Sequence, residues 1–429
     1  MTPTSSRWLN WKKDCNMKRK SIISALLCCF AFSLVSAQGE DERLQAHVKG
    51  FIDTYHALRT ESPNDWMSSR TRIRGELTLE KGNAGMFVSM NAVYNGILKD
   101  QTGLFLREAY LYYSKNAWDI RAGRQIITWG VADAMRLTDI ISPMDFTEYL
   151  AQDYDDIRIP VNAVRLRYVR NKWSAEAILI PVSSFYELPT DPENPWSVTL
   201  PGMTIPYTLS VGRTPDKKFK NIEFGARFGV YLSGVDFSFY ALRTFNKMPV
   251  FRKILSGDGA SLTCEGEYRR MTMLGADLSV PLGKFVLRAE VAEYLGEAQD
   301  PPVNAGVSTA NSLNALVGID WYPGDDWNVG LQYSHKYISN YTPQIASYRN
   351  SGMATVRLSK DLLHNTLNLS TFAYIDVSNA AIYNRLSADY ALTDQIHVLV
   401  GYDLFHADAG MFAMYDRSSE VWLKLKYSF

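Results

Sequence analysis

Charged side chains at every second position are the most distinctive chemical feature of this sequence. Residues 70–80 alternate charged or polar side chains with mainly apolar ones, beginning with Arg70, Arg72 and Arg74. Because successive side chains of a strand point to opposite faces of a sheet, a strand here would present three guanidinium groups in a row. Arg165 and Arg167 repeat this spacing between apolar neighbours. We call these five arginines the basic ladder, which could attract anions or pair with carboxylates.

Carboxylates gather in a second stretch, residues 145–156, which lacks strand-like alternation and which we call the acidic loop. If this acidic loop faced the basic ladder across a narrow passage, the opposed charges would create a transverse field that orients dipolar solutes. Alternatively, the arginines and carboxylates pair with one another, or the acidic loop is a solvated rim. The sequence leaves these alternatives open. The carboxylates of the acidic loop are Asp145, Glu148, Asp153, Asp155 and Asp156.

The other candidates for chemistry are isolated. None of the six histidines has the spacing of a metal site, and no glycine-rich phosphate loop follows a strand-like segment. The acidic loop lacks the ligand rhythm of a calcium loop. We therefore expect no metal and no cofactor, and the chain is not predicted to be an enzyme. The histidines are His47, His56, His335, His364, His397 and His406.

Segments with two unlike faces recur along the whole chain. In one of them Phe224, Ala226 and Phe228 alternate with Glu223 and Arg227. In a soluble sandwich such apolar faces would pack on a second apolar layer. Repeated this often without such a layer, they favour a barrel with lipid outside and water in its lumen. Further apolar faces run through residues 235–241, 274–280, 285–291, 315–321, 367–375 and 398–404.

The connections between these segments alternate between short and long. Short turns on one side and long loops on the other are typical of outer-membrane barrels. Beyond the N-terminal segment no run of 18 or more residues is apolar, so strands and not helices must cross the membrane. We predict an all-β fold, a transmembrane antiparallel β-barrel of about 18 strands (16 being the alternative), with short periplasmic turns and long extracellular loops. The longest connections are residues 130–160, 185–219, 249–267 and 295–310.

The N-terminal segment predicts export. Lys18, Arg19 and Lys20 precede an apolar run over residues 21–34, and the small residues 35–37 follow it, which are the three parts of a secretory signal peptide. Residues 1–37 are therefore interpreted as upstream residues plus a cleaved signal peptide, and residues 38–429 as a single barrel. Cleavage would remove six basic residues and one acidic residue from a chain with 45 of each, which leaves a formal charge of −5. This charge argues against nucleic acid as a partner.

The C-terminal segment has an unbroken apolar face that ends on an aromatic residue. The final ten residues are EVWLKLKYSF, with Val421, Leu423, Leu425, Tyr427 and Phe429 on one face. This pattern resembles the signal by which bacterial outer-membrane barrels are recognised for insertion. The partners expected are therefore outer-membrane lipid and the barrel-insertion machinery.

One region has a more specific motif. The stretch IRAGRQIITWGVADAMRLTDIISPMDF, residues 120–146, resembles a family of large outer-membrane barrels of unknown function and, more loosely, the porins of the alginate-export type. The resemblance covers less than a tenth of the chain and implies the architecture without the solute. Its motif residues are Gly123, Arg124, Gln125, Trp129, Gly130, Asp139, Pro143 and Asp145.

The function expected of such a barrel is passive diffusion of small hydrophilic solutes, anions among them, through a charged aqueous lumen. The alternative is an exporter or lipid-handling barrel that works with periplasmic partners. A plugged, energised transporter is not expected, because only six residues separate Ala37 from the first strand-like residue, Leu44. The sequence does not identify the solute, the direction of transport or the oligomeric state.

Overall fold

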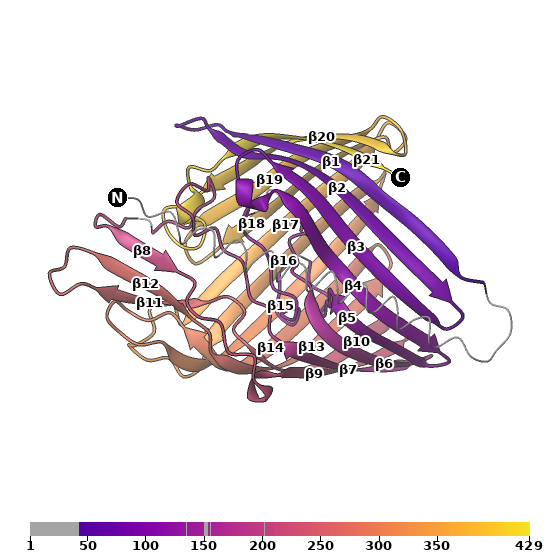
Figure 1. The fold of residues 1–429 in the computed structure, drawn as a ribbon, viewed down its shortest axis with the longest axis horizontal. Coiled ribbons are helices and arrows are strands. Elements are labelled where there is room, and N and C mark those ends of the chain that lie inside the picture. The colour runs from indigo at the N-terminus through magenta and orange to yellow at the C-terminus, as the bar shows by residue number, and fades with distance from the viewer. Residues whose placement is uncertain (1–42, 134, 150–152, 155, 201) are drawn as a thin grey trace, which may run out of the picture.

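The computed structural model describes residues 43–133, 135–149, 153–154, 156–200 and 202–429, and its main feature is one closed sheet of 18 strands (Figure 1). The described residues also form three short 3-10 helices, η1 (Lys99–Gln101), η2 (Phe219–Asn221) and η3 (Ala413–Tyr415). None of their helices is long and apolar enough to cross a membrane. The barrel strands are β1 (Gln45–Arg59), β2 (Trp66–Lys81), β3 (Ala84–Asn95), β4 (Gly103–Lys115), β5 (Trp118–Gln125), β6 (Val161–Arg170), β7 (Trp173–Val182), β9 (Glu223–Leu232), β10 (Val235–Phe245), β13 (Arg270–Leu282), β14 (Phe285–Gln299), β15 (Ser308–Gly324), β16 (Trp327–Ile338), β17 (Asn350–Leu362), β18 (Leu367–Asp376), β19 (Ala381–Ala391), β20 (Ile396–His406) and β21 (Glu420–Ser428).

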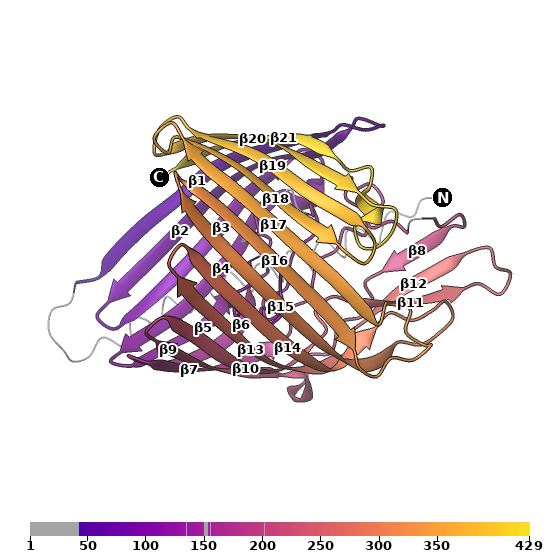
Figure 2. The same cartoon turned by 180° about the vertical axis from the view of Figure 1, so that it is seen from behind.

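The sheet closes between its first and last strands. Each barrel strand pairs antiparallel with the next one along the chain, and β21 pairs with β1 from Phe51↔Ser428 to Arg59↔Glu420. Gly50 and Phe429 complete the seam with two backbone hydrogen bonds of 2.9 Å. The structure thus confirms the predicted antiparallel barrel, and of the two predicted strand numbers 18 is correct. Figure 2 shows the wall formed by β14–β20 from behind.

The two faces of the strands differ as the alternation predicts. On β9, Phe224 and Phe228 point outward and are 57% and 44% exposed, whereas Glu223 on the opposite face is fully buried. The outward series on β10, β13 and β14 are apolar as well, and their registers run without interruption from strand to strand. Their inward positions are polar near the turns but include Leu242 and Met273 farther along the strands. Outward apolar and inward polar side chains define a barrel built for lipid, whose closure leaves no backbone edge unpaired in hydrocarbon.

Tight turns and long connections lie at opposite ends of the barrel. The start of β1 pairs with the end of β2, so the first strand begins at the end that carries the β2–β3 turn, and the C terminus lies there too. The long connections emerge at the other end. They include the β7–β9 connection (residues 183–222) and the β10–β13 connection (residues 246–269). This is the predicted asymmetry, with the turns on the periplasmic side.

A small second sheet, which the sequence did not predict, stands at the long-loop end (Figure 1). It consists of β8 (Tyr207–Ser210), β11 (Val250–Leu255) and β12 (Leu262–Glu267), with β12 in the middle. β8 is only four residues long and pairs in parallel with β12, far away in the sequence. Cys264 lies in β12 and is buried. The predicted signal peptide, residues 1–37, lies outside the described residues.

The packing inside the barrel wall gives a stability prediction. Gly401 on β20 faces inward, and a Cβ there would lie 2.2 Å from a ring atom of Trp422 and 2.3 Å from the Leu386 carbonyl oxygen. Gly401→Val should therefore lower the free energy of unfolding by about 1–3 kcal/mol, the usual cost of overpacking. Gly75→Val is the matched control, because nothing lies within 4 Å of a Cβ at Gly75. Heat-modifiability electrophoresis would measure the temperature at which each variant unfolds. Equal unfolding temperatures of the two variants would contradict the prediction.

Candidate functional site

The connection between β5 and β6, residues 126–160, folds into the barrel. We call it the inward loop. Its residues bond to inward-facing side chains of β7, β10 and β14 on one side and of β2 and β21 on the other. A connection that covered only the rim could not reach these strands along their inner faces. The lumen and this loop together form the candidate site.

One end of the inward loop is held by a single buried carboxylate, Glu290 on β14. Its oxygens accept hydrogen bonds from the backbone amides of Val131 (3.1 Å), Ala132 (3.2 Å) and Thr138 (2.6 Å), and from the Thr138 hydroxyl (2.9 Å). Hydrogen bonds to a charged acceptor are stronger than neutral ones. Gly130 permits this approach, because it adopts φ +86° and a Cβ there would lie 2.8 Å from a Glu290 oxygen. The turn of the loop is therefore fixed on β14.

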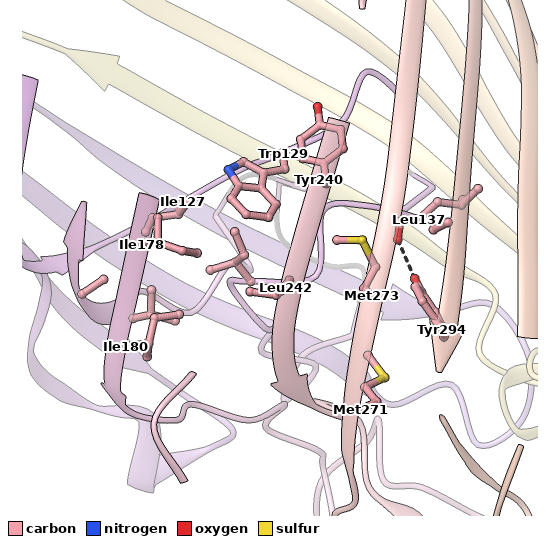
Figure 3. Close-up of a cluster of buried hydrophobic side chains, with 14 of the residues drawn as sticks. Ile127, Trp129, Leu137, Ile178, Ile180, Tyr240, Leu242, Met271, Met273 and Tyr294 are labelled. Carbon is pink, nitrogen blue, oxygen red and sulfur yellow. Dashed lines mark hydrogen bonds between the residues drawn. The ribbon is translucent and has the colours of Figure 1, made fainter. Parts of the chain in front are cut away.

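Apolar packing supports the same anchor (Figure 3). Trp129 and Leu137 of the loop belong to a buried cluster with Leu242 on β10 and Met273 on β13. The Trp129 ring lies 5.2 Å from that of Tyr240, and its indole nitrogen donates to Glu176 at 2.9 Å. The inner face of β10 and β13 is thus apolar where the inward loop covers it. The alternation alone predicted a mainly polar inner face, because nothing in it showed which inward positions a loop would cover.

The other end of the inward loop is held by the β2 part of the basic ladder. Arg70 pairs with Glu148 at 2.7 Å, and Asp156 bridges Arg72 (2.9 Å) and Arg74 (2.7 Å). The three arginines are only 4–6% exposed. Buried charges need partners with good geometry, which these contacts supply. The acidic loop and the ladder are therefore in contact here, and they do not face each other across open space.

Two further contacts complete this second anchor. Asp153 pairs with Lys424 on β21 at 2.7 Å, and Asp53 on β1 pairs with Arg72 at 2.5 Å. Burial by itself would raise the pKa of Asp156, but its arginine partners outweigh burial and hold that pKa well below its usual range. Asp156 therefore stays charged at any physiological pH. Asp155, which the sequence placed in the acidic loop, lies outside the described residues.

The two anchors lie on opposite walls. β2 is the second strand of the barrel and β14 is the eleventh, so eight strands lie between them on either side of the 18-stranded ring. Eighteen strands about 4.8 Å apart and tilted by about 40° give a backbone diameter of roughly 35 Å. The inward loop therefore crosses the full width of the lumen and is bonded at both ends.

The remaining ladder residues lie on a different wall. Arg165 on β6 is 3.4 Å from Glu176 and 3.7 Å from Asp119, and Arg167 forms no ion pair with any described residue. Two further arginines face inward beside them, of which the alternation in the sequence had shown only Arg227, as part of a polar strand face. They are Arg121, directly opposite Arg165 in register, and Arg227, directly opposite Glu176. We call Arg121, Arg165, Arg167 and Arg227 the arginine wall.

Ion pairs among the described residues do not reach all four arginines of the arginine wall. Its strands contribute two inward carboxylates to the same region, Asp119 and Glu176. Arg227 donates to the Ser238 hydroxyl at 3.1 Å and forms no ion pair within the described part of the chain. All four arginines are partly exposed to the lumen. The signal that could have found Arg121 was the same alternation that revealed Arg165, read on the neighbouring strand.

The motif residues around 123–145 shape the start and course of the inward loop. Gly123 has φ +138°, and a Cβ there would lie 2.4 Å from the Ala109 carbonyl oxygen. Asp139 accepts a hydrogen bond from the Trp129 amide at 3.2 Å and pairs with Arg158. The other motif contacts are Arg124 to the Arg107 carbonyl (3.1 Å), Gln125 to the Ala163 carbonyl (3.1 Å), the Pro143 carbonyl to the Ile159 amide (2.7 Å) and Asp145 to Thr147. These contacts fix the course of the loop.

Two other connections meet the inward loop at the long-loop end. The β7–β9 connection bonds to it through the backbone of Glu187 with Met144 (3.1 Å) and Phe146 (2.8 Å). Its Trp196 packs with Tyr149 of the loop and with Tyr415 of the β20–β21 connection, and the two tyrosine rings stack at 4.0 Å. Burial and the nearby Asp145 raise the pKa of Glu187 to about 7.

The inward loop does not fill the lumen. A cavity of about 280 Å³ remains between Leu137 of the loop and the strands β15–β18. Its lining includes the polar side chains of Asn314, Ser334, Lys336 and Asp376.

Comparisons with known proteins agree with this architecture. The chain matches, over residues 57–429, the model of a family described as a protein of unknown function (DUF1302). No curated protein matches it in sequence. Among solved structures it resembles OccK8 (OprE) of Pseudomonas aeruginosa, with a TM-score of 0.54, 8% identity, and coverage of 90% of this chain and 98% of that one. OccK11 (OpdR) of the same organism has a TM-score of 0.52 and 10% identity, with coverage of 92% of this chain and 99% of that one. The outer membrane channel DcaP of Acinetobacter baumannii has a TM-score of 0.45 and 12% identity, with coverage of 92% of this chain and 100% of that one. The Occ likenesses show a shared barrel fold.

The Glu290 anchor can be tested by hydrogen–deuterium exchange. Glu290→Ala removes the acceptor of three amides, each in a hydrogen bond to a charged group worth about 1.5–3 kcal/mol. Exchange in a peptide that covers residues 126–142 should become at least about tenfold faster. Glu293→Ala is the matched control, because Glu293 lies on the outward face of the same strand. Unchanged protection in Glu290→Ala would show that the turn is held by its apolar packing alone.

Proposed function

The chain belongs to the DUF1302 family of proteins of unknown function, and we propose that this outer-membrane β-barrel is a porin-like channel through which small hydrophilic solutes diffuse. The observation that carries the proposal is the inward loop, which is bonded to Glu290 on one wall and to Arg70, Arg72 and Arg74 on the opposite wall. A loop fixed in this way narrows the lumen to a defined passage without moving parts.

The chemistry of the remaining space supports hydrophilic solutes. The cavity beside the loop presents an ammonium, a carboxylate, amides and hydroxyls. Opposite charges along such a passage favour dipolar and charged molecules over apolar ones, which would lose contact with water and gain none with the wall. Solutes of several carbon atoms with polar groups are the class that fits.

The arginine wall supports a preference for anions. Arg70, Arg72 and Arg74 are neutralised by Glu148, Asp156 and Asp53, so they contribute little field to the passage. Arg167 and Arg227 have no ion pair among the described residues, and both face the lumen from neighbouring parts of one wall. Guanidinium groups in a partly shielded lumen raise the local concentration of anions.

The second candidate, an exporter or lipid-handling barrel with periplasmic partners, makes a different physical demand. It would need the inward loop to move or a conduit to bypass it. Buried ion pairs at one end and a four-fold hydrogen-bonded carboxylate at the other resist such movement. The geometry therefore favours passive diffusion around a fixed loop.

Planar-bilayer recordings test the channel and its selectivity. The wild-type protein should show stepwise openings and a reversal potential in a KCl gradient that is shifted toward chloride. Arg167→Gln with Arg227→Gln should lower the chloride-to-potassium permeability ratio about twofold or more, because two unneutralised charges are lost.

The matched control is Arg170→Gln on the same strand as Arg167. Arg170 lies on the outward face at the turn end and should leave the reversal potential unchanged. An unaltered ratio in the double variant would overturn the anion preference. Silence of several well-folded preparations would overturn the channel itself in favour of the exporter.

A pH dependence follows from Glu187. Its raised pKa means that it is largely neutral below about pH 7 and gains a negative charge above it. Anion permeability should therefore fall as pH rises from 6 to 8, with a midpoint near the pKa of Glu187. Glu187→Gln should remove this dependence, whereas Glu193→Gln in the same connection should keep it. A wild-type reversal potential that stays constant over this range would contradict the prediction.

A further inference from the structure

A basic segment with a fully projecting aromatic ring precedes β9. Residues 213–220 carry Arg213, Lys217, Lys218 and Lys220 against one carboxylate, Asp216. Between these lysines Phe219 is 91% exposed, the highest exposure among the large hydrophobic side chains of the described residues. A phenylalanine so exposed has no protein partner to compensate its contact with water. The question is therefore which part of the barrel surface the Phe219 ring lies on and what covers the ring there.

The segment lies on the outer surface of the barrel. The Arg270 guanidinium donates to the carbonyls of Lys220 and Ile222, each at 2.6 Å. Arg270 stands opposite Phe245 in register and lies 5.2 Å from its ring. Phe245 lies six residues after Phe239 on β10 and therefore on the same face of the sheet, as does its partner Arg270. Phe239 faces outward and is 53% exposed. The segment is thus tied to the outward face of β13 and β10 and not to the lumen.

Its depth places it at the level of lipid headgroups. The outward apolar series of β9 runs from Leu232 beside the turn to Ile222. Ten residues at about 3.3 Å each, tilted by about 40°, cover roughly 25 Å of membrane thickness, which is the height of the apolar band of such barrels. Ile222 is therefore at the outer border of the hydrocarbon, and residues 217–220 lie just beyond it.

Several cations at this level have no carboxylate partner among the described residues. Asp216 is shared by Arg213 (2.7 Å) and Lys218 (2.9 Å), whereas Lys217 and Lys220 form no ion pair with any residue that the structure describes. Arg243, opposite Phe224 in register, faces outward and donates to the Thr272 hydroxyl at 2.7 Å. We call Lys217, Lys220, Arg243 and Phe219 the rim patch.

The outward carboxylate of Glu293 does not neutralise the rim patch. Glu293 faces outward on β14, two strands from Arg243 around the barrel, and the described residues show no ion pair between them. The patch therefore presents net positive charge beside an exposed aromatic ring. This combination fits a surface that is acidic at its headgroups and apolar beneath them.

We propose that the rim patch binds a phosphorylated lipid of the outer leaflet, with its phosphate on Lys217, Lys220 and Arg243 and its acyl region against Phe219. Lysine and arginine side chains at this level reach toward phosphates while their methylene groups stay in the apolar layer. The binding is independent of whether the lumen conducts, so the site and the channel can fail separately.

Native mass spectrometry of the detergent-purified full chain tests the site, with lipid A as the probe. Lys217→Gln, Lys218→Gln and Lys220→Gln combined should weaken lipid A binding about tenfold or more, given the usual strength of a lysine near an anionic lipid surface. Lipid A without its phosphates should bind wild type as weakly as intact lipid A binds the triple variant. The matched control is Lys81→Gln, Lys115→Gln and Lys172→Gln combined, three exposed lysines at the turn end.

Folding of each variant is checked by heat-modifiability electrophoresis, and Arg243→Gln serves as a second variant outside the segment. Arg243→Gln should weaken lipid A binding severalfold, and Phe219→Ser should weaken it without altering the preference for phosphorylated over dephosphorylated lipid A. Equal affinity of wild type and the lysine triple variant would overturn the proposal. Equal binding of phosphorylated and dephosphorylated lipid A by wild type would overturn it as well.

Discussion

The constraint on which this structure depends is that no backbone polar group can be left unpaired in hydrocarbon. The sheet must close, and its first and last strands do so through a continuous register from Phe51 to Arg59. Closure at 18 strands gives a lumen much wider than a small solute, so the interior must be narrowed by something other than the wall. The inward loop crosses this interior, and charged side chains on the inner faces of β2, β14 and β21 hold it there.

The loop is held by few but strong contacts, placed where a shift would leave charge unpaired. Glu290 accepts four hydrogen bonds from one turn of the loop, and Asp156 lies between Arg72 and Arg74. Buried ion pairs add little net stability compared with apolar packing, but removing one partner is costly. We therefore interpret these contacts as fixing the position of the loop, while the cluster around Trp129 and Leu242 supplies most of its apolar burial.

The sequence predicted the features that depend on local periodicity. Alternation within segments such as 222–230 was enough to assign the outward and inward faces, because a strand has a period of two. It could not show that Glu290 binds Thr138, 152 residues away in the sequence. Nor could it show that Asp156 pairs with Arg74, because the sequence does not indicate whether the connection that contains Asp156 folds into the lumen or away from it. Arg227 was visible as an inward residue, but only the three-dimensional arrangement shows that it bonds to Ser238 and forms no ion pair with any described residue.

Arginines of equal sequence pattern thus have different physical roles. Arg72 and Arg167 both alternate with apolar neighbours and both face inward, yet Arg72 touches two carboxylates and Arg167 forms no ion pair with the described residues. The difference comes from the inward loop, because its acidic half supplies carboxylates to the arginines of β2. Near Arg167 the described part of the loop supplies no carboxylate but Trp129, which donates to Glu176, the cross-strand neighbour of Arg167 on β7. The path of one connection therefore determines which inward arginines are paired with its carboxylates.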